Sequence, residues 1–464
     1  MTILGEYVSA RATPELVGRE EILEHIRTAI VDTEKTPCVF YITSPGGWGK
    51  TRLVDAVIKK TNAKRKGGWS FSNVLVVSRL VDLYHTYTHS EEGIIADIVE
   101  SLDDKKGRRF KKYKSEHAEL DRVKYDLSQI LRAVTQQRSK MMATFLEDFN
   151  GLGDQFDKMV LAFDTVENLT YETDRVQQAL GLAEEPIGVG GWLVREFLPK
   201  IRNTVVLIAG RPETPQLQAE LERLEQSGKI RFTHIALETF TEAETLAYFD
   251  AVAGVARREN PQVADRLAGI PQETRQVVHY LSGGQPFLLS LFADYLVIAN
   301  EVLPEIHTPL AEVKERAGIA NGLEKERLEF RDAILQEFQR IRRPLDEVIR
   351  ALSWTPKGMG AELLAWILKR GQPTEEEIGQ AREYIRDLRD PKLRLSFVKI
   401  RDIDKLVFLQ DEMYSLMRSL HERGRLKHNV KQTYELIVRF YEERIKAQAK
   451  EVDKLQEANR NLLL

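Results

Sequence analysis

The sequence contains a single cysteine, Cys38, so an intramolecular disulfide is excluded. Cys38 begins an apolar run, and this position predicts a core residue rather than a reactive thiol. No apolar run approaches the ~18 residues that a membrane-spanning helix needs, and the N-terminus lacks the basic-then-apolar pattern of a secretory signal. We therefore expect a cytoplasmic protein without a membrane partner.

The chain also lacks a large excess of charge of either sign. Its formal net charge is −3, with 42% hydrophobic and 30% charged residues, which is typical of a globular protein. The balance excludes the whole chain as an electrostatic binder of nucleic acid or of anionic membranes. With 464 residues, the chain is long enough for roughly three domains.

Residues 39–43 form an apolar, β-branched run that ends in a glycine-rich turn, and the turn opens a helical pattern. The turn meets the phosphate-loop pattern G-x-x-x-x-G-K-[ST] at every fixed position except the first, where Ser44 replaces glycine. Glycines let the backbone curl until several N–H groups point at one spot, where the helix adds its positive end. Lys50 is placed to reach the β- and γ-phosphates, and the Thr51 hydroxyl is placed to bind Mg²⁺. The predicted nucleotide-binding residues of this stretch are Ser44, Pro45, Gly46, Gly47, Trp48, Gly49, Lys50, Thr51 and Arg52.

A second apolar run, residues 159–163, leads into Asp164. Ligands of open α/β sheets bind at the carboxyl ends of the strands, so an acid there is placed to hold Mg²⁺ or its waters. Glu167 is a candidate for orienting or deprotonating the attacking water, the alternative being a solvent-facing turn residue. Many hydrolytic P-loop proteins carry a second acid next to the first, but Thr165 stands there, which predicts slow hydrolysis.

A third apolar run, residues 204–210, ends in Arg211. A guanidinium at this strand end is a candidate sensor of the γ-phosphate, and the alternative is an ordinary surface arginine. The sequence thus predicts four catalytic residues, Lys50, Asp164, Glu167 and Arg211. It predicts Thr51 and Asp164 as metal ligands, with ATP or ADP and Mg²⁺ as cofactors.

The chain is mainly helical after residue 240, where Thr241 is a predicted helix N-cap. Residues 282–286 interrupt the helices with glycines and a proline. Two short apolar runs, residues 393–400 and 406–409, predict a β-hairpin after helices, an arrangement typical of a winged helix that binds DNA or packs against protein. A long helical pattern begins at Gln432.

In order along the chain, the motifs resemble the STAND class of signal-transduction NTPases, which includes NB-ARC and NACHT proteins. The motifs that carry the resemblance are Val17-Gly18-Arg19-Glu20, the loop from Ser44 to Thr51, Phe163-Asp164-Thr165-Val166-Glu167, Ala209-Gly210-Arg211, Gly283-Gly284-Gln285-Pro286 and a terminal winged helix. The resemblance implies an α/β, AAA+-like P-loop domain with a parallel sheet in residues 1–240. It further implies a small helical domain in 241–330, a winged helix in 331–428 and a helical arm in 429–464.

The resemblance also implies further nucleotide contacts. Val17, Gly18 and Arg19 would lie near the adenine, and the turn containing Gly284 and Pro286 would pack against the base and sugar. Many members have a winged-helix histidine that contacts the ADP β-phosphate in the closed form. Gln410 stands at the matching place, where its amide can donate a hydrogen bond but carries no titratable proton.

Members of the class act as switches, with ADP holding a closed monomer and ATP allowing an open form that oligomerises. We therefore expect a weak ATPase that self-associates when active and answers to an inducer ligand or protein. We also expect the natural chain to continue beyond Leu464 to a C-terminal sensor of that inducer. One alternative is an AAA+ ATPase with a DNA-binding winged helix, resembling replication initiators or loaders, although the acidic balance argues against nucleic acid. A second alternative is a non-hydrolysing scaffold whose nucleotide only stabilises the fold.

Overall fold

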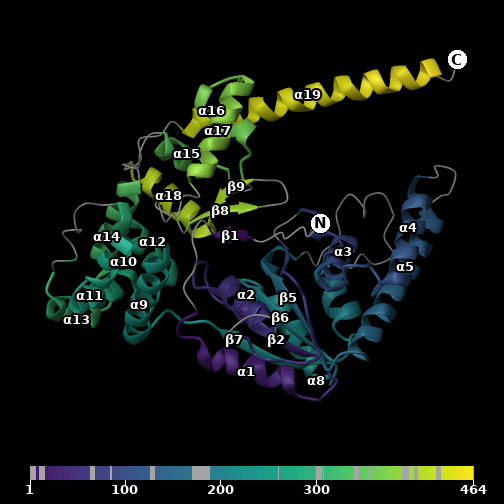
Figure 1. The fold of residues 1–464 in the computed structure, drawn as a ribbon, viewed down its shortest axis with the longest axis horizontal. Coiled ribbons are helices and arrows are strands. Elements are labelled where there is room, and N and C mark those ends of the chain that lie inside the picture. The colour runs from purple at the N-terminus through teal and green to yellow at the C-terminus, as the bar shows by residue number, and fades with distance from the viewer. Residues whose placement is uncertain are drawn as a thin grey trace. The chain divides into compact units, whose positions relative to one another are not determined.

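The computed structural model describes residues 7–9, 16–62, 68–83, 86–125, 131–169, 189–259, 261–298, 306, 308–338, 344–355, 358–388, 395, 397–401, 406–424 and 430–462 (Figure 1). The chain divides into two compact units. We call Gly18–Glu238 the parallel-sheet unit, and Met1–Val17 together with Thr239–Leu464 the helical unit.

The described part of the parallel-sheet unit contains a six-stranded sheet in the order β3-β5-β6-β2-β7, with β4 also paired to β5. All of these pairings are parallel. The strands are β2 (Cys38–Thr43), β3 (Val74–Val76), β4 (Val81–Asp82), β5 (Lys158–Asp164), β6 (Thr204–Gly210) and β7 (Arg231–Ala236). Every residue of β2, β5 and β6 is buried, as continuous apolar runs predict for a sheet covered on both faces. The predicted α/β class with a parallel sheet of the P-loop type is confirmed.

The strand order brings the predicted chemistry to one edge of the sheet. β6 lies between β2 and β5, with Thr43 opposite Gly210 and Phe163 opposite Ile208. The phosphate loop directly follows β2, Arg211 directly follows β6, and Asp164 is the last residue of β5. They therefore meet at the carboxyl edge, where parallel sheets bind their ligands. Cys38 is buried at the start of β2, and burial raises the pKa of its thiol, which confirms its predicted core role.

The helices of this unit are α1 (Glu20–Val31), α2 (Lys50–Thr61), α3 (Glu91–Leu102), α4 (Lys111–Tyr125), α5 (Leu131–Gly153), α7 (Val189–Trp192) and α8 (Pro215–Gln226). Helix α7 is short and passes into a π-wound turn over Leu193–Phe197. Helices α4 and α5 lie side by side as a pair between α3 and β5 in the chain (Figure 1). Two basic residues at the start of this pair of helices, which we call the helical insertion, contact acids: Arg108 lies 2.7 Å from Asp104, and Lys114 bonds to Asp103. These pairings are typical of a solvated insertion.

An aromatic cluster joins this insertion to the turn before β6. The ring of Phe197 lies 5.2 Å from Trp192, 5.6 Å from Phe149 and 5.9 Å from Phe145, measured between centroids. Phe197 is fully buried, so we expect Phe197→Ala to lower the free energy of unfolding by about 3–5 kcal/mol. Urea unfolding followed by circular dichroism would measure this. The control is Val31→Ala, whose side chain is largely exposed. A Phe197→Ala effect as small as that of the control would contradict the proposed packing role.

The helical unit begins with α9 (Glu242–Glu259), which Thr241 caps. The amide of Glu244 donates to Thr241 Oγ1 at 3.2 Å, and the amide of Thr241 donates to Glu244 Oε2 at 2.7 Å, so the predicted cap is confirmed. The next helices are α10 (Pro261–Ala268), α11 (Gln272–Ser282), α12 (Pro286–Ile298), α13 (Leu310–Ala317) and α14 (Glu324–Phe338). They are followed by α15 (Leu345–Leu352), α16 (Ala361–Lys369), α17 (Glu375–Asp387), α18 (Asp411–Glu422) and α19 (Val430–Leu462).

A three-stranded antiparallel sheet in the described part of this unit has the order β1-β8-β9. Its strands are β1 (Tyr7–Ser9), β8 (Val398–Arg401) and β9 (Val407–Leu409). The predicted hairpin is present as β8 and β9, and residues 393, 394 and 396 of the expected first strand lie outside the described residues. The expectation that residues 1–240 form one domain is corrected at its start, because Tyr7 pairs with Arg401. A three-residue strand carries too little periodicity to reveal a partner almost 400 positions away.

Candidate functional site

The glycine-rich loop after β2 has the backbone of a phosphate cradle. Gly47 and Gly49 adopt φ angles of 76° and 98°, a left-handed region that favours glycine. Gly49 precedes the first turn of α2, and its carbonyl accepts from the amide of Leu53 at 2.9 Å. Ser44 is buried, whereas residues 45–52 are half-buried or exposed and so are accessible to a ligand.

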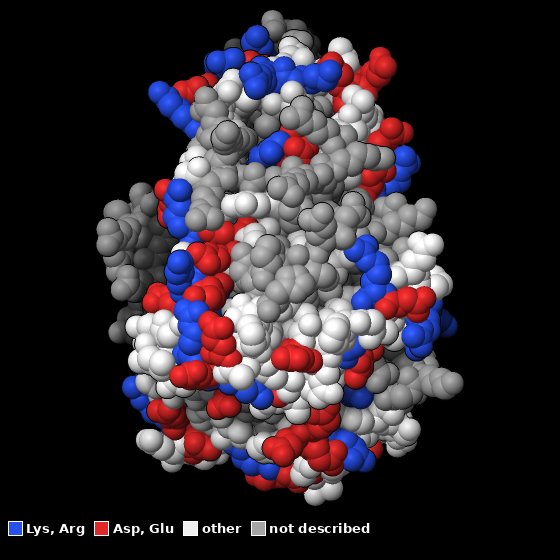
Figure 2. Space-filling view, turned by 90° about the vertical axis from the view of Figure 1, so that its left-hand side faces the viewer, with Lys and Arg blue, Asp and Glu red and all other residues white. Residues whose placement is uncertain are grey.

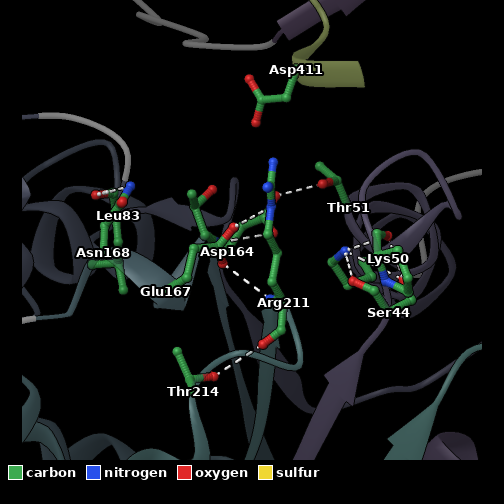
Figure 3. Close-up of polar contacts among 12 residues, drawn as sticks. Ser44, Lys50, Thr51, Leu83, Asp164, Glu167, Asn168, Arg211, Thr214 and Asp411 are labelled. Carbon is green, nitrogen blue, oxygen red and sulfur yellow. Dashed lines mark hydrogen bonds and ion pairs between the residues drawn. The ribbon is translucent and has the colours of Figure 1, made fainter. Parts of the chain in front are cut away.

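Lys50 lies across this loop. Its Nζ donates to the carbonyl oxygens of Ser44 at 2.6 Å and Pro45 at 3.0 Å, and it lies 3.3 Å from Ser44 Oγ (Figure 3). These oxygen atoms of the loop carry only partial charges. A phosphate oxygen with a full negative charge is a stronger acceptor for the same cation. The loop and Lys50 therefore fit a nucleotide phosphate.

Thr51 and Asp164 come together from different elements. Thr51 Oγ1, in the first turn of α2, donates to Asp164 Oδ2 at 2.6 Å (Figure 3). The amide of Thr165 donates to Asp164 Oδ1 at 2.9 Å and fixes the carboxylate. A hydroxyl and a carboxylate are the hard oxygen ligands that Mg²⁺ prefers.

These two side chains would supply only part of an octahedral set. Among the described residues, no group of three or more His, Cys, Asp or Glu side chains could hold a metal ion. Mg²⁺ usually binds through one or two protein oxygens together with substrate phosphates and waters. The donor set therefore fits a cation that arrives with a nucleotide rather than a resident metal.

Glu167 and Arg211, predicted as base and sensor, form an ion pair. Arg211 Nε lies 3.3 Å from Glu167 Oε1, and the Arg211 backbone amide donates to Glu167 Oε2 at 3.2 Å (Figure 3). The carbonyl of Arg211 accepts from Thr214 Oγ1 at 3.0 Å, which anchors the strand end. Arg211 therefore contacts both carboxylate oxygens of Glu167, one through its side chain and one through its backbone amide.

Gly210 allows Val166 and Glu167 to lie close to the end of β6, a role that its place in the motif does not predict. A Cβ at Gly210 would lie 2.4 Å from Val166 Cγ2 and 3.3 Å from Glu167 Oε2. Val166 and Glu167 belong to a short 3-10 turn, Val166–Asn168, that lies against the end of β6. A glycine directly before a strand-end arginine is the signal that indicates this close backbone approach.

Asp82 is a further acid at the same edge that sequence reasoning left without a role. It ends β4 and lies opposite Asp164 in the strand register. Asp82 Oδ1 accepts from Thr165 Oγ1 at 3.0 Å, and Thr165 has a left-handed φ of 62°. Thr165 stands where many hydrolytic P-loop proteins carry a second acid. Its hydroxyl is hydrogen-bonded to a carboxylate from the neighbouring strand. A two-residue strand is too short to be recognised from its pattern.

Arg19 joins the beginning of the parallel-sheet unit to its end. Its guanidinium donates to the carbonyl oxygens of Gly18 at 2.9 Å and Glu238 at 2.6 Å, and the residue is buried. Gly18 has a left-handed φ of 68°. These contacts give Arg19 a structural role. That Val17, Gly18 and Arg19 lie near the adenine stays a prediction.

Gly284, Pro286 and Gln410 belong to the helical unit. Gly284 ends the turn after α11, where a Cβ would lie 2.2 Å from the Phe240 carbonyl oxygen. Pro286 begins α12, and Gln410 precedes α18, where its backbone N–H donates to the Phe397 carbonyl at 2.9 Å. Each of the three residues therefore has a structural role in its own turn or helix start, and their contacts with a nucleotide stay predictions.

No helix in the described part of the chain combines the length and apolar character required for a bilayer crossing.

Comparison with protein-family models gives no match, and no curated protein matches the sequence. Among solved structures, the chain is similar to a Walker-type ATPase of Pyrococcus abyssi, with 15% identity and a TM-score of 0.37. The match covers 88% of this chain and 98% of the ATPase. It is also similar to a STAND protein with a tetratricopeptide repeat sensor from Pyrococcus horikoshii, with 15% identity and a TM-score of 0.38. That match covers 95% of this chain and 47% of the other, so this chain spans about half of that protein. A third is the Aeropyrum pernix ORC2 protein in ADPNP–ADP complexes, with 13% identity and a TM-score of 0.33, over 89% of this chain and 96% of that one.

Proposed function

We propose that this chain is an ATP- and ADP-dependent switch of the STAND type, which slow ATP hydrolysis resets. The observation that carries the proposal is the hydrogen bond between Thr51 Oγ1 and Asp164 Oδ2 beside Lys50 on the glycine-rich loop. This arrangement joins a phosphate-binding cation to a magnesium donor set at one edge of the sheet.

The chain's own residues would divide the work at the phosphates. Lys50 and the loop amides would bind the β- and γ-phosphates, and Thr51 and Asp164 would hold the cation. A bound Mg²⁺ would neutralise charge on the phosphates during transfer. Glu167 would orient the attacking water or accept its proton, and Arg211 would contact the γ-phosphate. Because Arg211 engages both oxygens of Glu167, water must compete for this carboxylate, which supports slow hydrolysis.

The helical unit would supply the response to the nucleotide. We propose that residues 241–330 form a small helical domain, that residues 331–428 form a winged helix, and that residues 429–464 form an arm toward a sensor of the inducer. In this scheme Gly284, Pro286 and Gln410 make contacts that differ between the ADP and ATP states. A nucleotide can shift such an equilibrium only through differential contacts of this kind. The ATP form would self-associate.

Asp164→Asn tests the magnesium site. We expect it to weaken Mg²⁺-dependent ATP binding by about 10- to 100-fold, because an amide replaces a charged oxygen ligand. Binding without divalent cation should change little. The measurement is a titration with fluorescent ATP in Mg²⁺ and in EDTA, with Asp55→Asn on α2 as the matched control. Equal losses in both buffers would assign Asp164 a purely structural role.

The switch itself is tested by the mass of the purified chain in each nucleotide state. We expect a monomer with ADP and a larger assembly with a slowly hydrolysed ATP analogue, by light scattering after size-exclusion chromatography. The nucleotide released on denaturation identifies the resting state. The same mass with both nucleotides would contradict the self-association step of the proposal.

We propose that the winged-helix region packs against protein rather than DNA. Several of its described cations are paired, with Lys369 3.0 Å from Glu377 and Arg350 2.6 Å from Asp346. On the face of the molecule that Figure 2 shows, Lys and Arg lie side by side with Asp and Glu over the described surface. DNA binding relies on phosphate contacts that weaken steeply with salt. Tight, salt-dependent binding of duplex DNA would therefore favour the initiator-like alternative.

A further inference from the structure

A pocket of about 600 Å³ lies within the helical unit, away from the phosphate loop in the chain. It is formed where the turn after α11 meets the segment between α13 and α14. Its polar lining includes Ser282, Gly283, Gln285 and Asn321. The volume is within the range of small-molecule sites.

Two arginines and one acid give the pocket its charge, namely Arg327, Arg331 and Glu324. Arg327 Nε donates to the Tyr280 carbonyl oxygen at 2.9 Å, which ties the guanidinium to the end of α11. A Cβ built on Gly283 would lie 3.8 Å from Arg327 Cζ, so the guanidinium lies close to the glycine turn. The lining therefore carries two positive charges against one negative charge.

Arg331 is the less well compensated of the two arginines. It is half-buried, and its Nε is buried without a hydrogen-bond partner among the described residues. Burial, and then the charges of Arg423 and Arg327, lower the pKa of Arg331. A bound anion would offset both effects, since it supplies an acceptor and an opposite charge.

The nearby carboxylates that could serve as that anion are largely engaged elsewhere. Asp332 pairs with Arg423, and Glu326 pairs with Arg316. Glu324 is exposed at the first residue of α14. The positive end of this 15-residue helix also lies at the pocket and favours negative charge there.

We propose that this pocket is a second ligand site, which binds a small phosphate-bearing molecule through Arg327 and Arg331. The planar guanidinium matches phosphate oxygens and can contact them in a bidentate manner. The site does not share residues with the phosphate loop, although its glycine turn neighbours Gly284 and Pro286, to which the proposed function assigns nucleotide contacts.

The test uses inorganic phosphate as the probe and the full chain, saturated with ADP so that the phosphate loop is occupied. Equilibrium dialysis with labelled phosphate at constant ionic strength measures the affinity. We expect saturable binding, weakened at least tenfold by Arg331→Gln and by Arg327→Gln. Lys325→Gln removes a neighbouring exposed charge from the same helix and should bind as the unaltered chain does.

Lys50→Ala separates this site from the phosphate loop. We expect this variant to keep phosphate binding even if it no longer binds ADP. Binding that is lost in Lys50→Ala and kept in the arginine variants would place the phosphate at the loop and overturn the proposal. The absence of binding in the unaltered chain, or an equal loss in Lys325→Gln, would overturn it as well. Thermal melting of each variant shows whether its fold is intact.

Discussion

Lys50→Ala is expected to weaken the binding of both ATP and ADP by at least about 100-fold. The ammonium bridges the loop through the Ser44 and Pro45 carbonyls and is placed to exchange them for phosphate oxygens. Hydrogen bonds between charged partners are roughly twice as strong as neutral ones, so the loss should exceed that of an ordinary contact. A loss of 100-fold corresponds to about 2.7 kcal/mol of binding free energy. Calorimetric titration with each nucleotide measures it.

The matched control is Lys59→Ala, which removes an exposed lysine from the other end of α2, where it pairs with Asp55. It should leave nucleotide affinity within about twofold, because surface ion pairs contribute little. If Lys50→Ala bound ATP as tightly as this control, the loop would not be a phosphate site and the proposed function would fail. The phosphate site at Arg331 could still exist, since none of its residues lies in the loop.

The sequence predicts those parts of the nucleotide site whose residues stand next to a recognisable strand pattern. The strands before Ser44, Asp164 and Arg211 are continuous apolar runs, which indicate buried parallel strands. Each ends at a residue with obvious chemistry, and the carboxyl ends of parallel strands share one edge. From these rules alone, the loop, the acid and the arginine are expected to lie close together.

The contacts that the sequence does not predict are long-range ones. Nothing local to Glu167 indicates that Arg211, 44 positions later, engages both of its oxygens. Asp82 joins the same edge through a two-residue strand, and β1 joins a sheet whose other strands lie almost 400 residues later. Pairing between distant segments depends on the whole fold and leaves no periodic pattern in either segment. The sequence does not predict the pocket at Arg331 for the same reason, since the pocket forms only where the turn after α11 meets the segment between α13 and α14.

Because Glu167 is paired with Arg211, a substitution of Glu167 tests whether its carboxylate serves in hydrolysis or only in the ion pair. Glu167→Gln keeps the shape of the side chain and an oxygen that can accept from Arg211, but the amide cannot take a proton from water. We expect steady-state phosphate release at saturating ATP and Mg²⁺ to fall by about 10²- to 10⁴-fold, the range that general bases contribute. ATP affinity should stay within about threefold, because the proposed role begins only after binding.

The control for this prediction is Glu213→Gln, an exposed carboxylate just after Arg211. It should leave phosphate release unchanged. Unchanged release in Glu167→Gln would make Glu167 the solvent-facing turn residue of the alternative, held by Arg211 for structural reasons alone. Release that is undetectable in the unaltered chain would favour the non-hydrolysing scaffold, because a nucleotide that is bound but never cleaved cannot reset a switch. A large loss confined to Glu167→Gln would instead support Glu167 as the residue that orients or deprotonates the attacking water, with Arg211 holding its carboxylate in place.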